Sequence, residues 1–324
     1  MDLSVSDLYI QDDVYSLNSG FYLVKASLKG TQLMKLALGK YMHESIDDQP
    51  ALNKAVKEMK KEKQLIVQTL SRELYPCGLI YFERGRRMFI GDNEYCEGKI
   101  CDAKPFIVHN NWIVSKAAKI YRFKEVGLWN YDFNGYYSNI TQKYIAYENP
   151  RDFGIKTIHH EKMALNTALT MGKILNRIVI LPKFHCHTCK NVACKQKHNL
   201  CAFNAHFNVR VFDHYFKGLY RENNFLNHYK VPKNIKESVS PNVYIDFDNH
   251  TDGIEKGNNT LLFKIGDNMK LDVGSFLSWL DARYTSKFNV LNFHSMYFDI
   301  NFNSISWDKQ LNDSLRKSKY RQSQ

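Results

Sequence analysis

The chain carries the sequence PFIVHNNWIVSKAAKIYRFKEVGLW at residues 105–129. Its apolar start, Phe106 to Val108, ends abruptly at His109, and a short apolar run bounded in this way predicts the end of a buried strand. Basic side chains then follow at roughly helical spacing, namely Lys116, Lys119, Arg122 and Lys124. An imidazole before a helix start rich in donors suits an anionic, metal-bridged group such as a nucleotide diphosphate.

Two earlier segments precede this one in a fixed order. The first is Leu17-Asn-Ser-Gly-Phe-Tyr-Leu-Val24, and the second is Ile46-Asp-Asp-Gln-Pro-Ala-Leu-Asn53. Together the three segments resemble the nucleotide-diphospho-sugar transferase family, A-type glycosyltransferases that include plant arabinosyl- and xylosyltransferases. The resemblance covers about residues 1–132 and continues more loosely through the second half of the chain.

The resemblance implies an α/β fold, in which part of an A-type glycosyltransferase (Rossmann-like) domain is followed by a second α/β domain. We expect residues 1–132 to form the C-terminal part of the transferase domain, 133–153 a linker, and 154–324 the second domain. In the second domain a predicted helix, Ile158 to Leu175, leads through a turn at Asn176 into a predicted buried parallel strand, Arg177 to Leu181.

Local patterns predict further elements in the first half. Strands are expected at Asp2 to Ser6 and Gly20 to Val24, helices at Lys29 to Tyr41 and Gln49 to Gln68, and a hairpin from Gly78 to Phe82 and Met88 to Ile90.

By resemblance, His109 is the predicted metal ligand. In the family, a histidine at this position completes the coordination of a divalent cation that bridges the donor diphosphate, and an imidazole suits Mn²⁺ better than Mg²⁺. Lys119, with Lys116 as the alternate, would neutralise the departing diphosphate, and Asn110 would help to bind the donor. The ordinary alternatives are a core or surface histidine and a solvated face of a helix.

The sugar is expected to lie against the two earlier motifs. Gly20 permits close backbone approach, and the amide of Asn18 can bond to sugar hydroxyls. By resemblance, Asp48 and Gln49 act on the sugar face opposite the leaving group, where a carboxylate stabilises positive charge at the anomeric carbon. The alternatives are a plain turn at Asn18 to Gly20 and capping of a helix by Asp47 or Asp48.

One family element is missing upstream of Asn18, namely the Asp-x-Asp that supplies the main metal ligands. Asp12 and Asp13 lie too close to the turn to replace it. Asp246-x-Asp248 has the right local shape but follows His109 instead of preceding Asn18. The chain is therefore expected to be an N-terminally truncated form of a longer Golgi enzyme, with an incomplete metal site and a membrane anchor only in the longer form.

Composition limits the alternatives. The chain has 324 residues and a net charge of +12. Its content of 44% hydrophobic residues is typical of a globular protein. No run reaches the ~18 to 20 apolar residues that span a bilayer, and the N-terminus has no signal-peptide pattern. The positive charge favours phosphate-bearing ligands or an acidic surface. Because it is dispersed, we expect no nucleic-acid partner, although a zinc-stabilised protein that binds nucleic acid remains the third alternative.

The seven cysteines allow two interpretations. Cys186 and Cys189 with His198 and Cys201 could supply a tetrahedral zinc set. The favoured alternative, in an oxidising lumen, is two disulfides among the cysteines at 186, 189, 194 and 201, a third bridge between 96 and 101, and a free cysteine at 77. Sequons at Asn139, Asn249, Asn258 and Asn312 agree with a secreted glycoprotein only weakly. The expected location is the Golgi lumen.

The resemblance implies transfer of a sugar from a nucleotide-diphosphate donor, expected to be UDP-linked, to a hydroxyl of a glycan or glycoprotein. It also implies retention at the anomeric carbon and a Mn²⁺ requirement. The alternative is a non-catalytic glycan-binding or scaffold protein of the secretory pathway.

Overall fold

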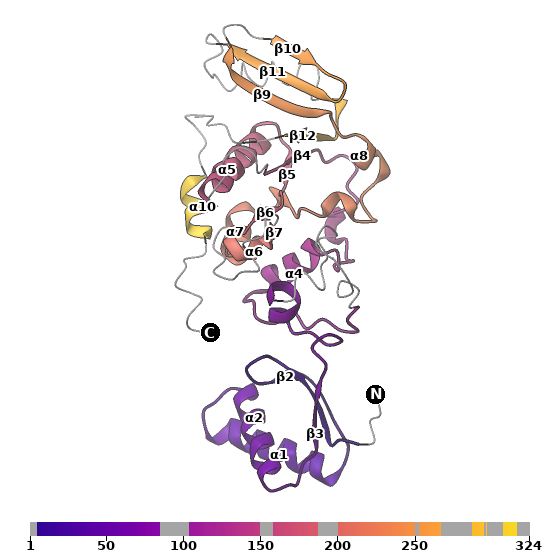
Figure 1. Ribbon diagram of the computed structural model, residues 1–324, viewed down its shortest axis with the longest axis vertical. Helices are drawn as coiled ribbons and strands as arrows, with labels where there is room; N and C mark the ends of the chain where they lie inside the picture. Colours follow the sequence, from indigo (N-terminus) through magenta and orange to yellow (C-terminus); the bar gives the residue numbers. More distant parts are fainter. Residues whose placement is uncertain are drawn as a thin grey trace. The chain divides into compact units, whose positions relative to one another are not determined.

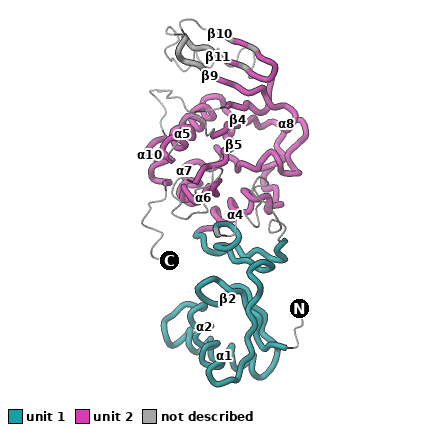
Figure 2. The backbone as a smooth tube through the Cα atoms, viewed as in Figure 1, with its two compact units in different colours: residues 1–114 teal, residues 115–324 magenta. Residues whose placement is uncertain are grey.

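The computed structural model describes residues 5–84, 104–149, 158–186, 200–249, 253–266, 287–294, 296 and 307–315. The chain forms two compact units, residues 1–114 and 115–324 (Figure 2). The boundaries expected from the sequence place the division further along the chain, at 132/133. Each unit is described by itself.

Unit 1 contains a three-stranded sheet with the order β2-β1-β3. The central strand β1 (Leu8–Asp12) pairs antiparallel with β2 (Leu17–Val24) and parallel with β3 (Val67–Leu70). The connection from β2 to β3 contains two helices, α1 (Leu28–His43) and α2 (Asp48–Lys61) (Figure 1). This arrangement places the start of β2 next to the start of α2.

The helices of unit 1 follow from local sequence. Ser27 caps α1, because its Oγ accepts a hydrogen bond from the backbone N–H of Gly30 at 3.2 Å. Helix α2 buries Leu52, Ala55, Val56 and Met59, which recur at helical spacing. It ends seven residues before the expected Gln68, because the chain turns at Lys63, where φ is 57°, and then enters β3.

Two strand predictions in unit 1 need correction. The first strand begins at Leu8, whereas residues 2–4 of the expected strand lie outside the described residues. The segment expected as a strand at 78–82 is helical instead and leads into the π-helical turn η1 (Ile80–Arg84). Its neighbouring side chains Tyr81 and Phe82 are both buried, which the alternation of a strand with one solvated face does not allow. The expected partner at 88–90 lies outside the described residues.

The apolar run before His109 is not a buried strand. Phe106 is 71% exposed and Ile107 is 43% exposed. The backbone N–H groups of both residues donate to the carbonyl of Leu74, and a single parallel bridge joins His109 to Cys77. The prediction of a strand end was therefore wrong about burial, because hydrogen bonds to one loop hold the segment extended while its side chains face solvent.

Unit 2 is built on a seven-stranded sheet with the order β10-β11-β9-β12-β4-β5-β8. Every neighbouring pair from β11 to β8 is parallel, and only β10 is antiparallel to its neighbour. Its strands are β4 (Tyr144–Tyr147), β5 (Ile178–Ile180), β8 (Tyr220–Arg221), β9 (Asn242–Asn249), β10 (Gly253–Lys256), β11 (Thr260–Gly266) and β12 (Val290–Phe293). The parallel sheet confirms the α/β fold class.

Two local predictions in this unit are confirmed. Helix α5 (Ile158–Ile174) begins and ends almost where the periodicity places it, and β5 pairs in parallel with strands on both sides. The turn between them uses Asn176 with φ of 51°, a conformation that asparagine tolerates well. In addition, the segment expected as a linker, 133–153, contains β4, which lies in the interior of the sheet between β5 and β12.

The remaining short elements of unit 2 are α4 (Lys116–Glu125), η2 (Phe133–Gly135), β6 (Phe184–His185), β7 (Leu200–Cys201), α6 (Phe203–His206), α7 (Val209–Phe216), η4 (Phe225–Asn227), α8 (Lys233–Glu237) and α10 (Asp308–Ser314). Within the described residues, no helix combines the length and the apolar character that a membrane span requires.

Candidate functional site

The three sequence motifs meet in unit 1. Asn18, at the start of β2, is 2% exposed, and its Nδ2 lies 3.1 Å from Nδ1 of His109. The neighbouring Ser19 donates through its hydroxyl to Asp48 Oδ2 at 2.6 Å. The first motif is therefore in direct contact with each of the other two, although 91 positions separate Asn18 from His109.

Gln11 joins this group although no motif contains it. Its side chain is fully buried in β1, and its Nε2 donates to the carbonyl of Tyr75 at 2.9 Å. Its Oε1 accepts from Asn18 Nδ2 at 2.9 Å and lies 3.0 Å from Nδ1 of His109. The sequence offered one sign of this role, a glutamine directly after the apolar run Leu8–Ile10. A glutamine that continues a buried strand needs hydrogen-bond partners for its amide, so it predicts a polar contact in the core.

Gly20 makes room for the imidazole of His109. A Cβ atom at this position would lie 2.7 Å from His109 Cε1 and 3.1 Å from Asn18 Oδ1. The backbone N–H of Gly20 donates to that same Oδ1 at 2.8 Å. The close approach expected for this glycine is therefore an approach of the protein's own imidazole.

The second motif fastens α2 to the start of β2. The amide of Asn53 accepts from the N–H of Leu17 at 2.9 Å and donates to its carbonyl at 2.7 Å. Gln49 Nε2 donates to the hydroxyl of Ser16 at 2.8 Å. Asp47 occupies the N-cap position of α2, but its side chain makes no capping hydrogen bond. The motif thus holds two elements in register and leaves Asp48 exposed at the start of the helix.

Asp13 organises the other side of the site. Its buried carboxylate accepts from Asn111 Nδ2 at 2.8 Å and from Trp112 Nε1 at 2.6 Å. Burial raises the pKa of the Cys77 thiol, and a hydrogen bond to Asp13 raises it further. Trp112 has φ of 59°, a strained backbone that its bond to Asp13 helps to hold. Asp13 is thus a structural anchor, and its carboxylate already has protein partners.

The described residues contain no complete metal site, because no group of three or more histidine, cysteine, aspartate or glutamate side chains gathers among them in a way that could hold an ion. His109 fits the chemistry of a Mn²⁺ ligand, since its Nδ1 faces the amide of Gln11 and such contacts commonly orient metal-bound imidazoles. It would supply one nitrogen, and further oxygen ligands would have to come from the donor or from other residues.

The other predicted residues fall in different places. Asn110 is buried in unit 1 next to His109. Lys116 and Lys119 lie on α4 in unit 2, and both are exposed. Asp246 and Asp248 lie within β9 of unit 2.

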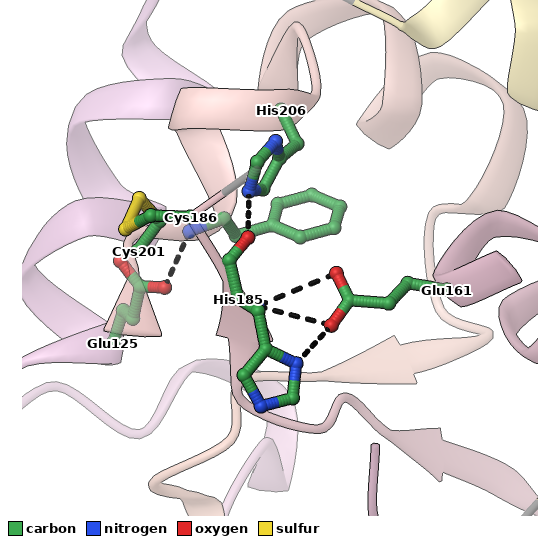
Figure 3. The surroundings of a disulfide bond; sticks show 7 residues. Glu125, Glu161, His185, Cys186, Cys201 and His206 are labelled. Carbon is green, nitrogen blue, oxygen red and sulfur yellow. Dashed lines mark hydrogen bonds and ion pairs between the residues drawn. A yellow bond between two sulfur atoms is a disulfide. The ribbon is translucent and has the colours of Figure 1, made fainter. Parts of the chain in front are cut away.

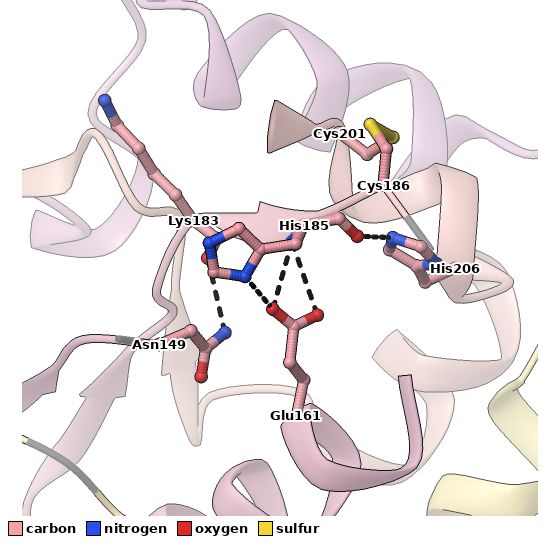
Figure 4. A network of polar contacts seen from close by, with 7 residues as sticks. All are labelled: Asn149, Glu161, Lys183, His185, Cys186, Cys201 and His206. Carbon is pink, nitrogen blue, oxygen red and sulfur yellow. Dashed lines mark hydrogen bonds and ion pairs between the residues drawn. A yellow bond between two sulfur atoms is a disulfide. The ribbon is translucent and has the colours of Figure 1, made fainter. Parts of the chain in front are cut away.

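A second polar network surrounds a disulfide in unit 2 (Figure 3). Cys186 and Cys201 are joined, and they adjoin the short β6–β7 pair. The fully buried Glu161 accepts from the backbone N–H of His185 at 3.0 Å and from its ring Nδ1 at 2.6 Å (Figure 4). His206 Nε2 donates to the carbonyl of His185 at 2.7 Å. The network fixes the position of His185 from several sides.

The Cys186–Cys201 bond confirms one of the expected disulfides. Two members of the alternative zinc set are thus bonded to each other. Cys77 is a free, buried cysteine, as expected. The cysteines at 96, 101, 189 and 194 lie outside the described residues, as does His198.

A third cluster in unit 2 buries charge among aromatic rings. The carboxylate of Glu222 accepts from the hydroxyls of Tyr136 at 2.6 Å and Tyr137 at 3.0 Å. The ammonium of Lys124 lies 3.1 Å from the centre of the Tyr136 ring. Burial lowers the pKa of Lys124 to about 8, although Glu222 opposes this shift. Every partner in this cluster is internal, which is typical of a structural network.

Comparison with known proteins gives the family context. Residues 3–123 match the family described as nucleotide-diphospho-sugar transferase. A UDP-galactose:fucoside alpha-3-galactosyltransferase of Dictyostelium discoideum is 27% identical over 139 residues, which cover 38% of this chain and 20% of the relative. The beta-arabinofuranosyltransferase RAY1 of Arabidopsis thaliana is 28% identical over 131 residues, or 36% and 22% of the two chains.

The chain spans about a fifth of the length of these curated relatives, and no solved structure matches it. The match confirms the predicted family resemblance, and it covers the first two motifs and the third as far as residue 123.

Proposed function

We propose that unit 1 binds the sugar and diphosphate of a nucleotide-sugar donor and serves the transfer of that sugar to a hydroxyl of a glycan or glycoprotein. The observation that supports this most directly is that Asn18 contacts His109 while its neighbour Ser19 donates to Asp48. These residues come from three separate motifs of a glycosyltransferase family. Ser19 and Asn18, adjacent on β2, join the exposed carboxylate of Asp48 and the half-buried imidazole of His109 into one group.

The contacts distribute the roles within this group. Asn18 is buried and both ends of its amide bond to the protein, so it acts by positioning Gly20 and His109. Asp48 is exposed, and its carboxylate can stabilise positive charge that develops on a sugar. Gln49 donates to Ser16 and thereby holds the turn before the motif.

The expected donor is UDP-linked, the expected metal is Mn²⁺, and the expected stereochemistry is retention. A bound Mn²⁺ would act as a Lewis acid that neutralises charge on the diphosphate. His109 would hold it through one nitrogen. Lys116 and Lys119, the partners of the diphosphate expected by resemblance, belong to unit 2, so the proposal for unit 1 does not depend on them. The activities named for the two relatives, transfer from UDP-galactose and arabinofuranosyl transfer, agree with a nucleotide-sugar donor.

The Cys186–Cys201 disulfide supports a compartment that permits disulfides, because such bonds are rare in the cytosol. We therefore propose the Golgi lumen as the site of action.

Calorimetry of the full chain with UDP, in the presence and absence of Mn²⁺, tests the proposal. Metal-dependent binding is expected for the wild type. His109→Ala should lose at least about 100-fold in affinity, because loss of a residue that only supports a metal ligand already costs about 10- to 100-fold. The matched control is His43→Ala, which removes an exposed histidine at the end of α1 in the same unit. Absence of UDP binding by the wild type with Mn²⁺ would contradict the proposal.

A non-catalytic role is the second candidate. It is favoured by the incomplete set of metal ligands in the described residues. A glycan-binding or scaffold protein of the secretory pathway would bind glycans with the same affinity whether or not UDP and Mn²⁺ are present. Glycan binding measured under both conditions separates the two functions.

A further inference from the structure

We infer that Gln11 is a positioning residue, which fixes the proton of the neutral His109 imidazole on Nδ1 and so makes Nε2 the basic nitrogen. The inference concerns the tautomer of His109 and stands on hydrogen-bond geometry. Its consequence for metal binding rests on the proposed function. No sequence motif contains Gln11, which precedes His109 by 98 positions.

The orientation of the Gln11 amide follows from Tyr75. A backbone carbonyl can only accept, so the group at 2.9 Å from the carbonyl of Tyr75 must be the NH₂ of Gln11. The carbonyl oxygen Oε1 then faces His109 at 3.0 Å. The side chain is fully buried in the central strand of the sheet, which leaves it little freedom to turn over.

The orientation of Asn18 is fixed in the same manner. Its Oδ1 accepts from the backbone N–H of Gly20 at 2.8 Å, so its NH₂ group points to Gln11 and His109. Three atoms therefore come together, namely Gln11 Oε1, Asn18 Nδ2 and His109 Nδ1.

The shape of this group decides where the proton lies. Asn18 Nδ2 lies 2.9 Å from Gln11 Oε1 and 3.1 Å from His109 Nδ1, and these two atoms are 3.0 Å from each other. The directions from Asn18 Nδ2 to the two atoms therefore differ by about 60°. The two N–H bonds of an amide diverge by about 120° and cannot point at both. With one bond of Asn18 directed at Gln11 Oε1, a bare Nδ1 would face that oxygen without a proton between them. A proton on Nδ1 removes this repulsion, because Oε1 can accept from two donors.

The tautomer determines which edge of the ring can accept. With Nδ1 protonated, the lone pair lies on Nε2, the nitrogen required of a neutral histidine that ligates a metal through this atom. That edge of the ring lies against Gly20, which is exposed: the position of a Cβ there would be 3.3 Å from Nε2. Gln11 and Gly20 thus act on opposite edges of one imidazole.

Nitrogen-15 NMR of the His109 ring, at a pH where the ring is neutral, tests the inference directly. The wild type is expected to show a protonated Nδ1 and an unprotonated Nε2. Gln11→Met removes the acceptor Oε1 and leaves the NH₂ group of Asn18 facing Nδ1. Because that group donates, Nδ1 should then accept, and the proton is expected to move to Nε2. Gln68→Met is the matched control, since Gln68 is exposed in β3 of the same unit and its loss should leave the tautomer unchanged.

Gln11→Glu provides a second variant. Its carboxyl group, when protonated on the side of the Tyr75 carbonyl, retains an oxygen acceptor for His109 and should keep the proton on Nδ1. Calorimetry with UDP and Mn²⁺ then adds a functional measurement: Gln11→Met is expected to lose about 10- to 100-fold in affinity and Gln68→Met none. A wild-type ring protonated on Nε2 overturns the inference whatever the metal does. If the wild type is protonated on Nδ1 but binds no UDP with Mn²⁺, the proposed function fails and the role of Gln11 stands.

Discussion

The hydroxyl of Ser19 donates to the carboxylate of Asp48 at 2.6 Å, which joins the first sequence motif to the second. The pair is exposed, so its contribution to the free energy of unfolding is small. Its importance lies in position, since Ser19 is adjacent to the buried Asn18 that touches His109. The exposed carboxylate is therefore held by a rigid part of unit 1.

Asp48→Asn separates the chemical role of this carboxylate from its structural role. We expect a change of less than about 1 kcal/mol in the free energy of unfolding. Transfer of sugar from a UDP-linked donor should fall by at least about 100-fold, because an amide does not stabilise developing positive charge as a carboxylate does. Denaturant titration and product formation measure the two effects. Equal activity of the variant and the wild type would remove Asp48 from the mechanism.

Gly20→Ala should displace the imidazole of His109, because the added Cβ would lie 2.7 Å from Cε1. The expected cost is about 1 to 3 kcal/mol of stability, with weaker binding of Mn²⁺ and UDP. Gly39→Ala is the control: nothing lies within 4 Å of its Cβ position on α1. This variant should gain about 0.5 to 1 kcal/mol. Urea unfolding of both variants checks the opposite signs.

Asn53→Ala should loosen the contact of α2 with β2. The substitution leaves the N–H and the carbonyl of Leu17 without their amide partner. We expect a loss of about 1 to 3 kcal/mol in the free energy of unfolding. Lys57→Ala, an exposed change on the same helix, should cost less than about 0.5 kcal/mol. Similar costs for the two variants would show that Asn53 does not join the motifs energetically.

Lys124 should give unit 2 a distinctive dependence on pH. Burial lowers the pKa of this group from 10.5 to about 8. Between these values the unfolded chain holds a proton that the folded protein has lost, so the free energy of unfolding rises with pH. The pKa of the buried Tyr136 is raised well above 10, so above pH 10 the unfolded chain loses a proton that the folded protein keeps. In that range Tyr136 therefore lowers the free energy of unfolding as the pH rises.

The useful window is therefore pH 8 to 10. Lys124→Met should lack the part of the rise that Lys124 causes, whereas Lys217→Met, at an exposed lysine of the same unit, should retain it. Urea unfolding of the three proteins at both ends of the window provides the comparison. Parallel pH profiles for wild type and Lys124→Met would contradict the assigned cause.

Loss of the Cys186–Cys201 disulfide should destabilise unit 2. The two cysteines are 15 positions apart, and closing a loop of this size contributes about 3 kcal/mol. The double variant Cys186→Ser, Cys201→Ser avoids a leftover thiol, and its urea midpoint should fall accordingly. An unchanged midpoint under oxidising conditions would show that the bond does not contribute to folding.

Local periodicity was enough to predict α1, α5 and β5, because each has its own repeating pattern or turn signal. The run Phe106–Val108 has the apolar pattern of a buried strand but lies exposed, because its backbone bonds only to a loop. The strand predicted at 78–82 failed for a similar reason. Gly78 packs closely against the backbone carbonyl of Asn111, a contact that no local pattern shows.

The candidate site was predictable in its motif residues but not in its supporting residues. Family resemblance led to Asn18, Asp48 and His109. Gln11 and Asp13 act through bonds to residues 98 positions away, and no local pattern in a single sequence shows such pairs. The only sequence sign was polar character at the end of a core strand.

Strand β12 has a consequence for synthesis of the chain. It inserts between β4 and β9, and its residues 290–293 emerge from the ribosome long after residues 144–147, with which they pair. Until then, the described strands of this sheet can pair only within two separate groups, β4-β5-β8 and β9-β10-β11. The described sheet of unit 2 can therefore close only after residues 290–293 have been synthesised, whereas unit 1 ends at residue 114.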